Sequence, residues 1–543
     1  MALSQTRESA ERTVRRRRWE PMTMVAVGSV AALVVTLVPL LVISAYNHSY
    51  ADDWHYGVWA HLSLQETGGN ILVAIGVAAE QVGKAWMEWQ GTYSAIFLMA
   101  LEPSVFGEQW YVLAAPIVIG CLVAGTFYFA RVLLVDYLHA PRSIWVSVSC
   151  AILVVTLLLQ PSPVEGLYWF NSAVYYTVYH AALLVLIGVL LKVVHPARQG
   201  RCRGLDAWAC VLAVFIAGGN FVDALVALEF GVALLAWLLH MRSRRSVDVF
   251  PAFAGLVLGV TVSMVAPGNS VRQQTQFPDA GAGVVDTIVK SFWAAFTYLS
   301  EWTQALVVLA ALFVLPLAVR AVSGRAASGL RYPLPGLVSV VSLAVLGTSF
   351  TPTFWSMGTV GPGRVQNARF DLFVILVMVN LFWWCGWVVR HRRELAEGPV
   401  MVVCPPPVPR ADACVLSARN AARACGLVAL VFVLVVCALS TDEKSGETLT
   451  SVSAARSLMS GQAVEYDRQV TARLDQLQTA SEAEDAADAE VDVTFYTDAP
   501  KVLFMGDVRD NMGNYINYRL AQWYGLKSVI GVHATATATG SSS

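Results

Sequence analysis

Charged residues are scarce in this chain. Asp, Glu, Lys and Arg make up 14% of its 543 residues, whereas a soluble globular protein usually carries about a quarter. Hydrophobic residues make up 56%, and they gather in runs of roughly 17–25, the length at which a helix crosses a bilayer. A net charge of -1 gives no general attraction to nucleic acid. The composition therefore predicts an all-α polytopic membrane protein with no nucleic-acid partner.

Several sequence motifs are also missing. The chain has no Walker A pattern, no nucleotide-binding glycine fingerprint, no HExxH and no GxSxG, so these enzyme classes lose support. All nine cysteines fall in predicted spans or cytoplasmic loops, which predicts no structural disulfide. Cys404 and Cys414 stand in a CPPPVP context without a nearby His, which argues against a metal site there.

Eleven apolar runs are predicted to cross the membrane. They are 22–44, 110–134, 144–159, 173–194, 205–218, 221–240, 250–265, 302–319, 334–350, 372–389 and 426–440. An odd number of spans places the two termini on opposite sides. The first run follows four arginines, is too long for a signal peptide and has no clean cleavage site, so we interpret it as a retained signal anchor. The stretch 205–240 contains Gly-Gly-Asn and is a candidate broken or re-entrant pair.

The basic residues of the short loops set the orientation. Every alternate loop is rich in arginine, and the pattern stays in phase along the chain, as the positive-inside rule requires. The basic residues of the predicted inside loops are Arg15 to Arg18, Arg142, Arg198, Arg201, Arg203, Arg242, Arg244, Arg245, Arg320, Arg325, Arg331, Arg390, Arg392, Arg393, Arg410, Arg419 and Arg423. We therefore predict a cytoplasmic N-terminus and an extracytoplasmic C-terminus.

The predicted organisation has four parts. They are a basic cytoplasmic segment (1–21), a transmembrane domain (22–440) with a first outer loop (45–109), an extracytoplasmic α/β segment (441–533) and a disordered tail (534–543). Two outer stretches have helical amphipathic spacing and predict helices on the membrane surface, at 71–89 and 284–299. In the C-terminal segment the pattern predicts helices at 449–487 and 514–523 and a strand at 491–504.

An acidic and aromatic cluster follows the first predicted span, on the exported side. It consists of Asp52, Asp53, Trp54 and His55. Two carboxylates and an imidazole among aromatic rings suit general-base catalysis or metal binding at a sugar site. The alternative is a helix N-cap beside an interfacial aromatic belt.

A second cluster follows the third predicted span at the same outer surface. It contains Glu165, Trp169, Asn171 and Tyr175. The alternative is an interfacial aromatic belt. A belt accounts for the tyrosine, but it accounts less well for a Glu and an Asn inside an aromatic run.

Three arginines lie in predicted outer segments, where arginine is normally depleted. They are Arg272, Arg364 and Arg369, with Asn269 and Asn367 beside them. A guanidinium binds phosphate through two parallel donors, so the arginines predict a phosphate ligand. The alternative is pairing with outer carboxylates, for example Asp279 or Asp371.

With these motifs in this order, the chain resembles the GT-C superfamily of membrane glycosyltransferases, and within it a group of bacterial proteins. The resemblance is carried by ADDW after the first span, WMEWQGTY (86–93), EGLYWFNSAVYY (165–176), the APGN turn with Arg272, and GRVQNAR (363–369). It covers residues 20–440 and, loosely, 511–525. It implies a bacterial plasma-membrane protein that moves a sugar from a polyprenyl-phosphate carrier to an envelope glycan, lipid or protein acceptor on the exported face.

The resemblance also implies an essential acid in the first outer loop. Asp52 and Asp53 occupy that position, and the choice between them stays open. With Glu165 they form the expected catalytic set, in which a carboxylate removes the acceptor's proton while arginines stabilise the leaving phosphate. The expected substrate-binding set adds Glu88 to the aromatic, amide and arginine residues above. No cofactor is firmly expected, although Mg²⁺ or Mn²⁺ at the two aspartates stays open.

Two other classes of protein fit parts of the pattern. A transporter or flippase for a lipid-linked sugar would suit a broken helix near Gly218 and an intramembrane acid such as Glu229. No repeat relates the two halves, however, and the polar groups gather at one face. The other alternative is a non-catalytic subunit of an envelope assembly complex, with the C-terminal segment as its docking module.

The in-phase basic loops generate a topological prediction. A reporter that is active only outside the cytoplasm should be active when fused after Ser440, because an odd number of spans separates this position from the basic N-terminus. Activity of a cytoplasm-only reporter at the same position would contradict the orientation or the span count.

Overall fold

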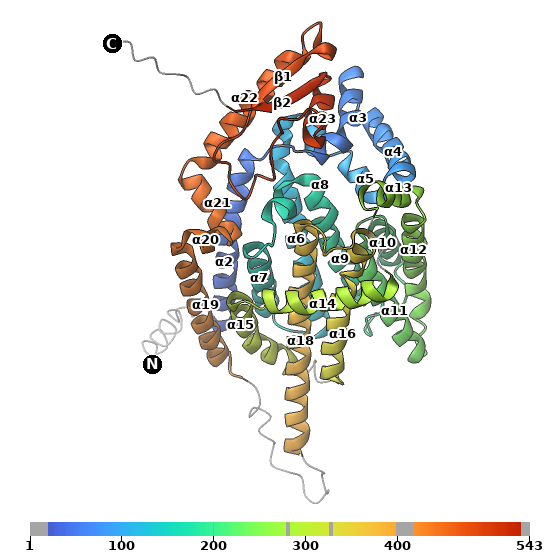
Figure 1. Ribbon diagram of the computed structural model, residues 1–543. Helices are drawn as coiled ribbons and strands as arrows, with labels where there is room; N and C mark the ends of the chain where they lie inside the picture. The colour runs from blue at the N-terminus through green and yellow to red at the C-terminus, as the bar shows by residue number, and fades with distance from the viewer. Residues whose placement is uncertain (1–19, 199, 279–282, 325–329, 398–415, 534–543) are drawn as a thin grey trace, which may run out of the picture.

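The computed structural model describes residues 20–198, 200–278, 283–324, 330–397 and 416–533. Residues 1–19 of the segment expected to be basic and cytoplasmic (1–21), the segment expected to be disordered (534–543), and Cys404, Cys414 and Asp279 lie outside these residues. The described chain is almost entirely helical. Its long helices form a bundle, and residues 441–533 pack on one end of it (Figure 1). We call residues 441–533 the tail, that end of the bundle the tail face, and the other end the opposite face.

The bundle and its connecting elements follow the chain in order. The long helices are α2 (Pro21–Ile43), α6 (Ala114–Arg131), α7 (Arg142–Leu158), α9 (Tyr179–Val193), α10 (Arg203–Ala217), α11 (Phe221–His240), α12 (Ser246–Met264), α15 (Ala305–Val322), α16 (Pro335–Thr348), α18 (Gly363–Glu397) and α19 (Ala418–Thr441). The other helices before the tail are α3 (Asp52–Glu66), α4 (Ile71–Glu88), α5 (Tyr93–Met99), α8 (Phe170–Ala173), α13 (Pro267–Gln276), α14 (Val284–Trp302) and α17 (Thr351–Met357). Short 3₁₀ turns are η1 (Ser44–Tyr46), η2 (Pro103–Phe106) and η3 (Glu108–Leu113), and π-helical turns are η4 (Val132–Tyr137), η5 (Val164–Tyr168) and η6 (Val174–Val178).

All eleven predicted spans are helical, but fewer are long enough to cross a membrane. In the described residues nine helices have the necessary length and apolar composition, as in a multi-pass membrane protein. The two others are α7 and α10. With 15 residues, α10 extends about 22 Å at 1.5 Å per residue, short of the roughly 30 Å hydrocarbon core. It ends at Gly218, and the side chain of Asn220 then caps α11 by accepting from the backbone N–H of Asp223. The count of eleven spans is therefore not confirmed.

Helices α4 and α14 carry apolar side chains on an exposed surface. Helix α4 leaves Leu72 79% exposed, and α14 runs across α16 and α18 instead of alongside them (Figure 1). On α14, Val285 and Trp293 are each 75% exposed. Exposed apolar faces on helices outside the main bundle direction are typical of helices that lie at a lipid interface.

The tail consists of helices and one two-stranded sheet, and it packs against α2, η1 and α3. It contains α20 (Glu443–Glu447), α21 (Thr450–Met459), α22 (Gln462–Ser481), η8 (Ala486–Asp488), β1 (Glu490–Thr494), α23 (Tyr515–Tyr524) and β2 (Ser528–Val532). The two strands pair in parallel, with Glu490 opposite Ser528. The predicted strand 491–504 is shorter than expected: Phe495 still donates its backbone N–H to Val532 of β2, but the N–H groups of Tyr496 and Thr497 donate to the side chains of Asp507 and Gln469.

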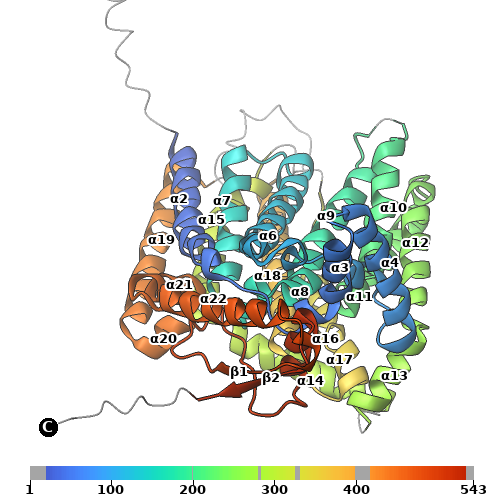
Figure 2. The same cartoon turned by 90° about the horizontal axis from the view of Figure 1, so that it is seen from above.

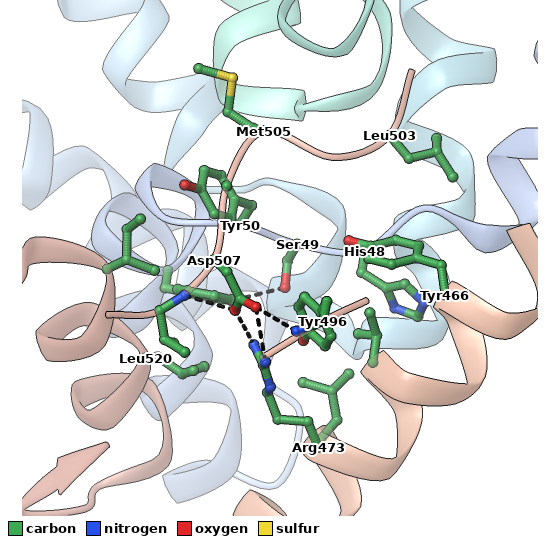
Figure 3. Close-up of a pocket in the computed structure, with 16 residues that line it drawn as sticks. His48, Ser49, Tyr50, Tyr466, Arg473, Tyr496, Leu503, Met505, Asp507 and Leu520 are labelled. Carbon is green, nitrogen blue, oxygen red and sulfur yellow. Dashed lines mark hydrogen bonds and ion pairs between the residues drawn. The ribbon is translucent and has the colours of Figure 1, made fainter. Parts of the chain in front are cut away.

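One ionic contact joins the tail to the bundle. His48 follows α2 and η1. Its Nδ1 lies 3.3 Å from Glu108 of η3, and its Nε2 lies 2.9 Å from Asp467 of α22 in the tail. Beside it Arg473 and Asp507 form a buried ion pair within the tail, 2.6 Å apart (Figure 3). The cavity among these residues measures about 30 Å³, room for a water molecule or two. This contact is therefore a packed interface and not a sugar site.

The His48 contact predicts a pH-dependent stability of the tail. Burial disfavours the charged ring, but hydrogen bonds with Asp467 and Glu108 outweigh it and raise the pKa of His48 to about 9. Because the folded pKa exceeds the unfolded value of about 6.5, the stabilisation is complete below about pH 6.5 and is lost as the pH rises through 9. We expect His48→Gln to remove on the order of 1 kcal/mol at pH 6, since Asp467 is partly screened by solvent, and to lose this effect at pH 10.

Thermal unfolding and limited proteolysis of the tail, measured from pH 6 to pH 10, test this expectation. His240→Gln, at the exposed end of α11, is the matched control and should leave the pH profile unchanged. A His48→Gln protein with the wild-type pH profile would contradict the assignment.

Candidate functional site

The two adjacent aspartates at the start of α3 have different surroundings. Asp53 is fully buried, and both of its oxygens accept hydrogen bonds. Oδ2 accepts from the Tyr111 hydroxyl (2.5 Å) and from the backbone N–H of Tyr50 (3.0 Å), and Oδ1 accepts from the backbone N–H of Asn171 (3.1 Å). Burial raises the pKa of Asp53, and these hydrogen bonds act in the opposite direction. Asp53 thus joins α3, η3 and α8 and has no face open to a substrate.

Asp52 is the accessible member of the pair. Its side chain is partly exposed, and Oδ1 accepts a hydrogen bond from the hydroxyl of Tyr515 in the tail, at 2.7 Å. Its backbone carbonyl accepts from the side-chain amide of Asn171, also at 2.7 Å. Asn171 therefore holds both aspartates, one through its backbone and one through its side chain. Of the two carboxylates, only that of Asp52 can meet a substrate.

The backbone before Asp52 adopts a sparsely populated conformation. Ala51 has φ 49° and ψ −94°, a region that L-residues avoid and that costs on the order of 1–3 kcal/mol. Neighbouring contacts hold it in place: the Trp169 indole donates to the carbonyl of Tyr50, and the N–H of His55 donates to the carbonyl of Ala51. The strain turns the chain sharply from the extended segment after α2 into α3.

Glu165 and Arg364 form an ion pair near the aspartates. Arg364 Nη1 lies 3.2 Å from Glu165 Oε1, and the Ser162 hydroxyl donates to Glu165 Oε2 at 2.9 Å. The guanidinium also lies over the Trp169 ring, 5.3 Å from its centre. Arg364 stays partly exposed and lies within electrostatic range of Asp52. The side chain of Trp169 therefore connects the Asp52 turn to the first turn of α18.

Glycines allow η5 and the first turn of α18 to pack closely together. A Cβ on Gly363 would lie 2.5 Å from Glu165 Oε2, and a Cβ on Gly166 would lie 2.5 Å from the Asn367 amide. Glu165 itself lies in the π-helical turn η5, and Tyr175 lies in the π-helical turn η6. Such turns widen a helix locally and are frequent at functional sites.

Arg272 approaches the same region from α13. Its Nη1 donates to Gln90 at 2.9 Å, its guanidinium lies 5.2 Å from the centre of the Trp89 ring, and its buried Nε has no partner in the described residues. Arg272 and Arg364 both interact electrostatically with Tyr175. Arg272 also interacts with Tyr56, whose pKa is raised by burial and by Asp52. Two cations from separate helices, α13 and α18, therefore both interact with Tyr175.

His55 lies between Tyr56 of α3 and Tyr515 of the tail. Its ring is 4.7 Å from that of Tyr56 and 6.1 Å from that of Tyr515. Burial and the positive charge of Arg519 lower the pKa of His55 to about 4, so the imidazole is neutral at pH 7. Its buried Nδ1 has no hydrogen-bond partner among the described residues, which leaves it available to a ligand.

Several residues expected to bind substrate have other roles in the structure. Arg369 is fully buried and donates to the carbonyls of Ser349 and Val360 and to Thr353, which leaves no free donor pair for a phosphate. Asn367 binds the backbone of Ser162 through both amide atoms. Asn269 caps the turn after α12. Trp54 packs in the core between α3 and the tail. Glu88 is exposed at the end of α4.

The structure adds residues that sequence reasoning did not select. Tyr515 and Arg519 come from α23 of the tail, Tyr56 comes from α3, and Tyr111 comes from η3. The stretch NYINYRLAQWY after Asn514 carries three tyrosines on a capped helix, and this aromatic excess was the available signal. The pairing of Tyr111 with Asp53 is separated by 58 residues and leaves no local pattern.

The aspartates do not fit a divalent cation well. Both oxygens of Asp53 already accept hydrogen bonds, so the pair offers only the carboxylate of Asp52. Mg²⁺ requires near-octahedral oxygen coordination. In the described part of the chain no group of three or more His, Cys, Asp or Glu residues is arranged to hold a metal ion.

The contrast between the two aspartates generates a stability prediction. Asp53→Asn should lower the unfolding free energy by about 2–4 kcal/mol. The substitution replaces one carboxylate oxygen with an NH₂ group, so at least one buried donor loses its acceptor and faces another donor. Asp52→Asn should cost about 1 kcal/mol or less, since it changes one partly exposed hydrogen bond. Thermal unfolding of the purified proteins at pH 7 measures both changes. Equal losses in the two variants would contradict the different burial of the two side chains.

No protein-family model matches this chain, and no curated protein matches its sequence.

Proposed function

We propose that the chain is a membrane glycosyltransferase that moves a sugar from a polyprenyl-phosphate carrier to an envelope acceptor at the tail face. The observation that carries the proposal is the grouping of one accessible carboxylate, Asp52, with two arginines: Arg364 interacts electrostatically with Asp52, and Arg272 and Arg364 both interact with Tyr175. A carboxylate opposite cations is the arrangement that sugar transfer from a phosphate leaving group requires. The order of GT-C-like motifs in the sequence supports the same assignment.

Asp52 is the general base in this proposal. It removes the proton of the acceptor hydroxyl while that oxygen attacks the anomeric carbon of the donor sugar. The bond between the anomeric carbon and the carrier's phosphate oxygen breaks, and the carrier leaves as a polyprenyl phosphate. The hydroxyl of Tyr515, which donates to Asp52 Oδ1, fixes the carboxylate and leaves its second oxygen for the acceptor.

Arg364 and Arg272 stabilise the charge that develops on the leaving phosphate. Glu165 acts through Arg364: with both of its oxygens occupied, it positions the guanidinium and is not itself the base. The aromatic rings of Tyr56, Tyr175 and His55 suit the apolar faces of a sugar. The buried Nδ1 of His55 and Oδ1 of Asn171, both without partners in the described residues, are available to sugar hydroxyls.

The proposed location is a bacterial plasma membrane, with the tail face outside. The basic residues at the opposite face support this orientation through the positive-inside rule. A lipid-linked donor also explains why such a site lies at one end of a membrane bundle, because the carrier's chain stays in the bilayer while its phosphate reaches the membrane surface.

A second candidate function is transport of a lipid-linked sugar. A polar cluster inside the bundle favours it: His180 Nδ1 lies 3.7 Å from Asp223 Oδ1, and both oxygens of the buried Asp371 have no partner in the described residues. Ionisable groups at such depth are costly and often belong to ion or proton pathways. The non-catalytic subunit with a docking tail remains the third alternative, and inactivity of the purified protein alone would favour it.

Sugar transfer in detergent tests the proposal. Asp52→Asn should reduce transfer about 10²–10⁴-fold while donor binding stays nearly intact, since the base acts on the acceptor's proton. Arg364→Ala should weaken donor binding and slow transfer together, because its partner is the phosphate in both the ground and transition states. Arg364→Lys should recover part of this loss, as it keeps the charge without the two-donor geometry.

The assay uses purified protein with a polyprenyl-phosphate sugar and measures turnover and donor affinity separately. Glu66→Gln, at the exposed last residue of α3, is the control. Full activity of Asp52→Asn would remove the main support for the enzyme assignment. Movement of the lipid-linked sugar across a vesicle membrane without its turnover would establish the transporter instead.

A further inference from the structure

A large apolar cavity lies at the edge of the bundle, far from the site above. It measures about 590 Å³ and lies between α2, α7, α15 and α19. Seen from above, α2 and α19 lie side by side at one margin of the bundle, with α7 and α15 next to them (Figure 2). Small residues form much of the wall, among them Gly28, Ala32, Ala151 and Ala310. A cavity of roughly 150 Å³ with such a lining already takes small apolar ligands and excludes water.

The cavity is accessible from the surrounding lipid. Helix α19 is apolar, yet only 6% of its spanning stretch is buried. Leu427 and Leu434 on this helix are 65% and 59% exposed. A helix that contacts the bundle along one side and is exposed along the rest leaves the adjacent space open to the bilayer.

One end of the cavity is cationic. Arg419 and Arg423, one turn apart on the same side of α19, are the only charged side chains among the described residues that line it. Neither forms an ion pair with a described residue. The first residue of α2, Pro21, lines the same end, which is at the opposite face. Two neighbouring guanidinium groups suit a phosphate group with planar donor pairs.

The length of the cavity suits a lipid chain. Its lining extends along α19 from Arg419 to Val433, about 21 Å at 1.5 Å per residue. Half of a bilayer's hydrocarbon core is about 15 Å thick. An acyl chain beginning at the arginines can therefore lie within the cavity for the full depth of its own leaflet.

We propose that this cavity binds one acidic phospholipid from the leaflet at the opposite face, with its phosphate at Arg419 and Arg423 and an acyl chain between α2 and α19. The bound lipid fills the space that the small side chains leave and holds α19 against the bundle. The tail continues directly from α19, and the Arg456 side chain of α21 bonds to the carbonyl of Ser440 at the end of that helix. The site is independent of the proposed sugar transfer.

Phosphatidylglycerol binding to the purified, delipidated full chain tests the proposal by native mass spectrometry and thermal shift. We expect one tightly held phosphatidylglycerol that raises the melting temperature. The double variant Arg419→Ala/Arg423→Ala should bind it about tenfold more weakly or worse, as expected for lost charge-assisted contacts. Arg203→Ala/Arg392→Ala is the matched control, because both arginines are exposed and lie outside the cavity. It should bind like the wild type.

A second variant tests the cavity without changing its charge. Gly28 has open space around the position of a Cβ, so Gly28→Leu should fill the cavity, keep the fold and exclude the lipid. Equal binding of phosphatidylcholine, equal losses in the two double variants, or unchanged binding to Gly28→Leu would each overturn the proposal. Displacement of phosphatidylglycerol by polyprenyl phosphate at equal concentration would also overturn it, because the cavity would then belong to the carrier.

Discussion

The structure of the tail face depends on the hydrogen bonds that the buried carboxyl group of Asp53 accepts. These three hydrogen bonds come from separate parts of the chain: the strained turn before α3, the 3₁₀ turn η3 and the short helix α8. Without this acceptor, three buried donors would lose their partner at once, and each carries a substantial penalty. The same network fixes Asn171 and through it the backbone of Asp52. The exposed carboxylate is therefore oriented by the buried one beside it.

This division of roles explains why two adjacent acids need not form a catalytic pair. Successive residues of a helix project about 100° apart, so Asp52 and Asp53 face different environments although they are neighbours in sequence. One faces the tyrosines and arginines at the surface of the tail face, and the other faces the interior. The same principle separates Arg364 from Arg369 on α18: the first reaches Glu165 and the site, whereas the second is fully buried against Phe350.

The sequence predicted the helices well because each apolar run is long and continuous, and such a pattern is local. The count of eleven spans is not confirmed, since α7 and α10 are not among the nine described helices that are long and apolar enough to cross a membrane, and α10 ends at Ala217. The sequence singled out the arginines because outer segments normally contain few of them, and it singled out the acids because they follow predicted spans and stand among aromatic residues. It could not assign their roles, because burial depends on distant partners such as Tyr111. For the same reason, the aromatic excess around Tyr515 did not reveal its bond to Asp52, which lies 463 residues away in the sequence.

The hydrogen bond between Tyr515 and Asp52 joins residues separated by 463 positions. During synthesis the carboxylate enters the membrane with the first helix, whereas the tyrosine emerges after all the others. The surroundings of Asp52 thus stay incomplete throughout insertion, and they close only when the tail has reached the same side and folded. Correct insertion of every intervening helix is then a precondition for this hydrogen bond, so a chain inserted with one helix missing or inverted would leave Asp52 without its partner in the tail.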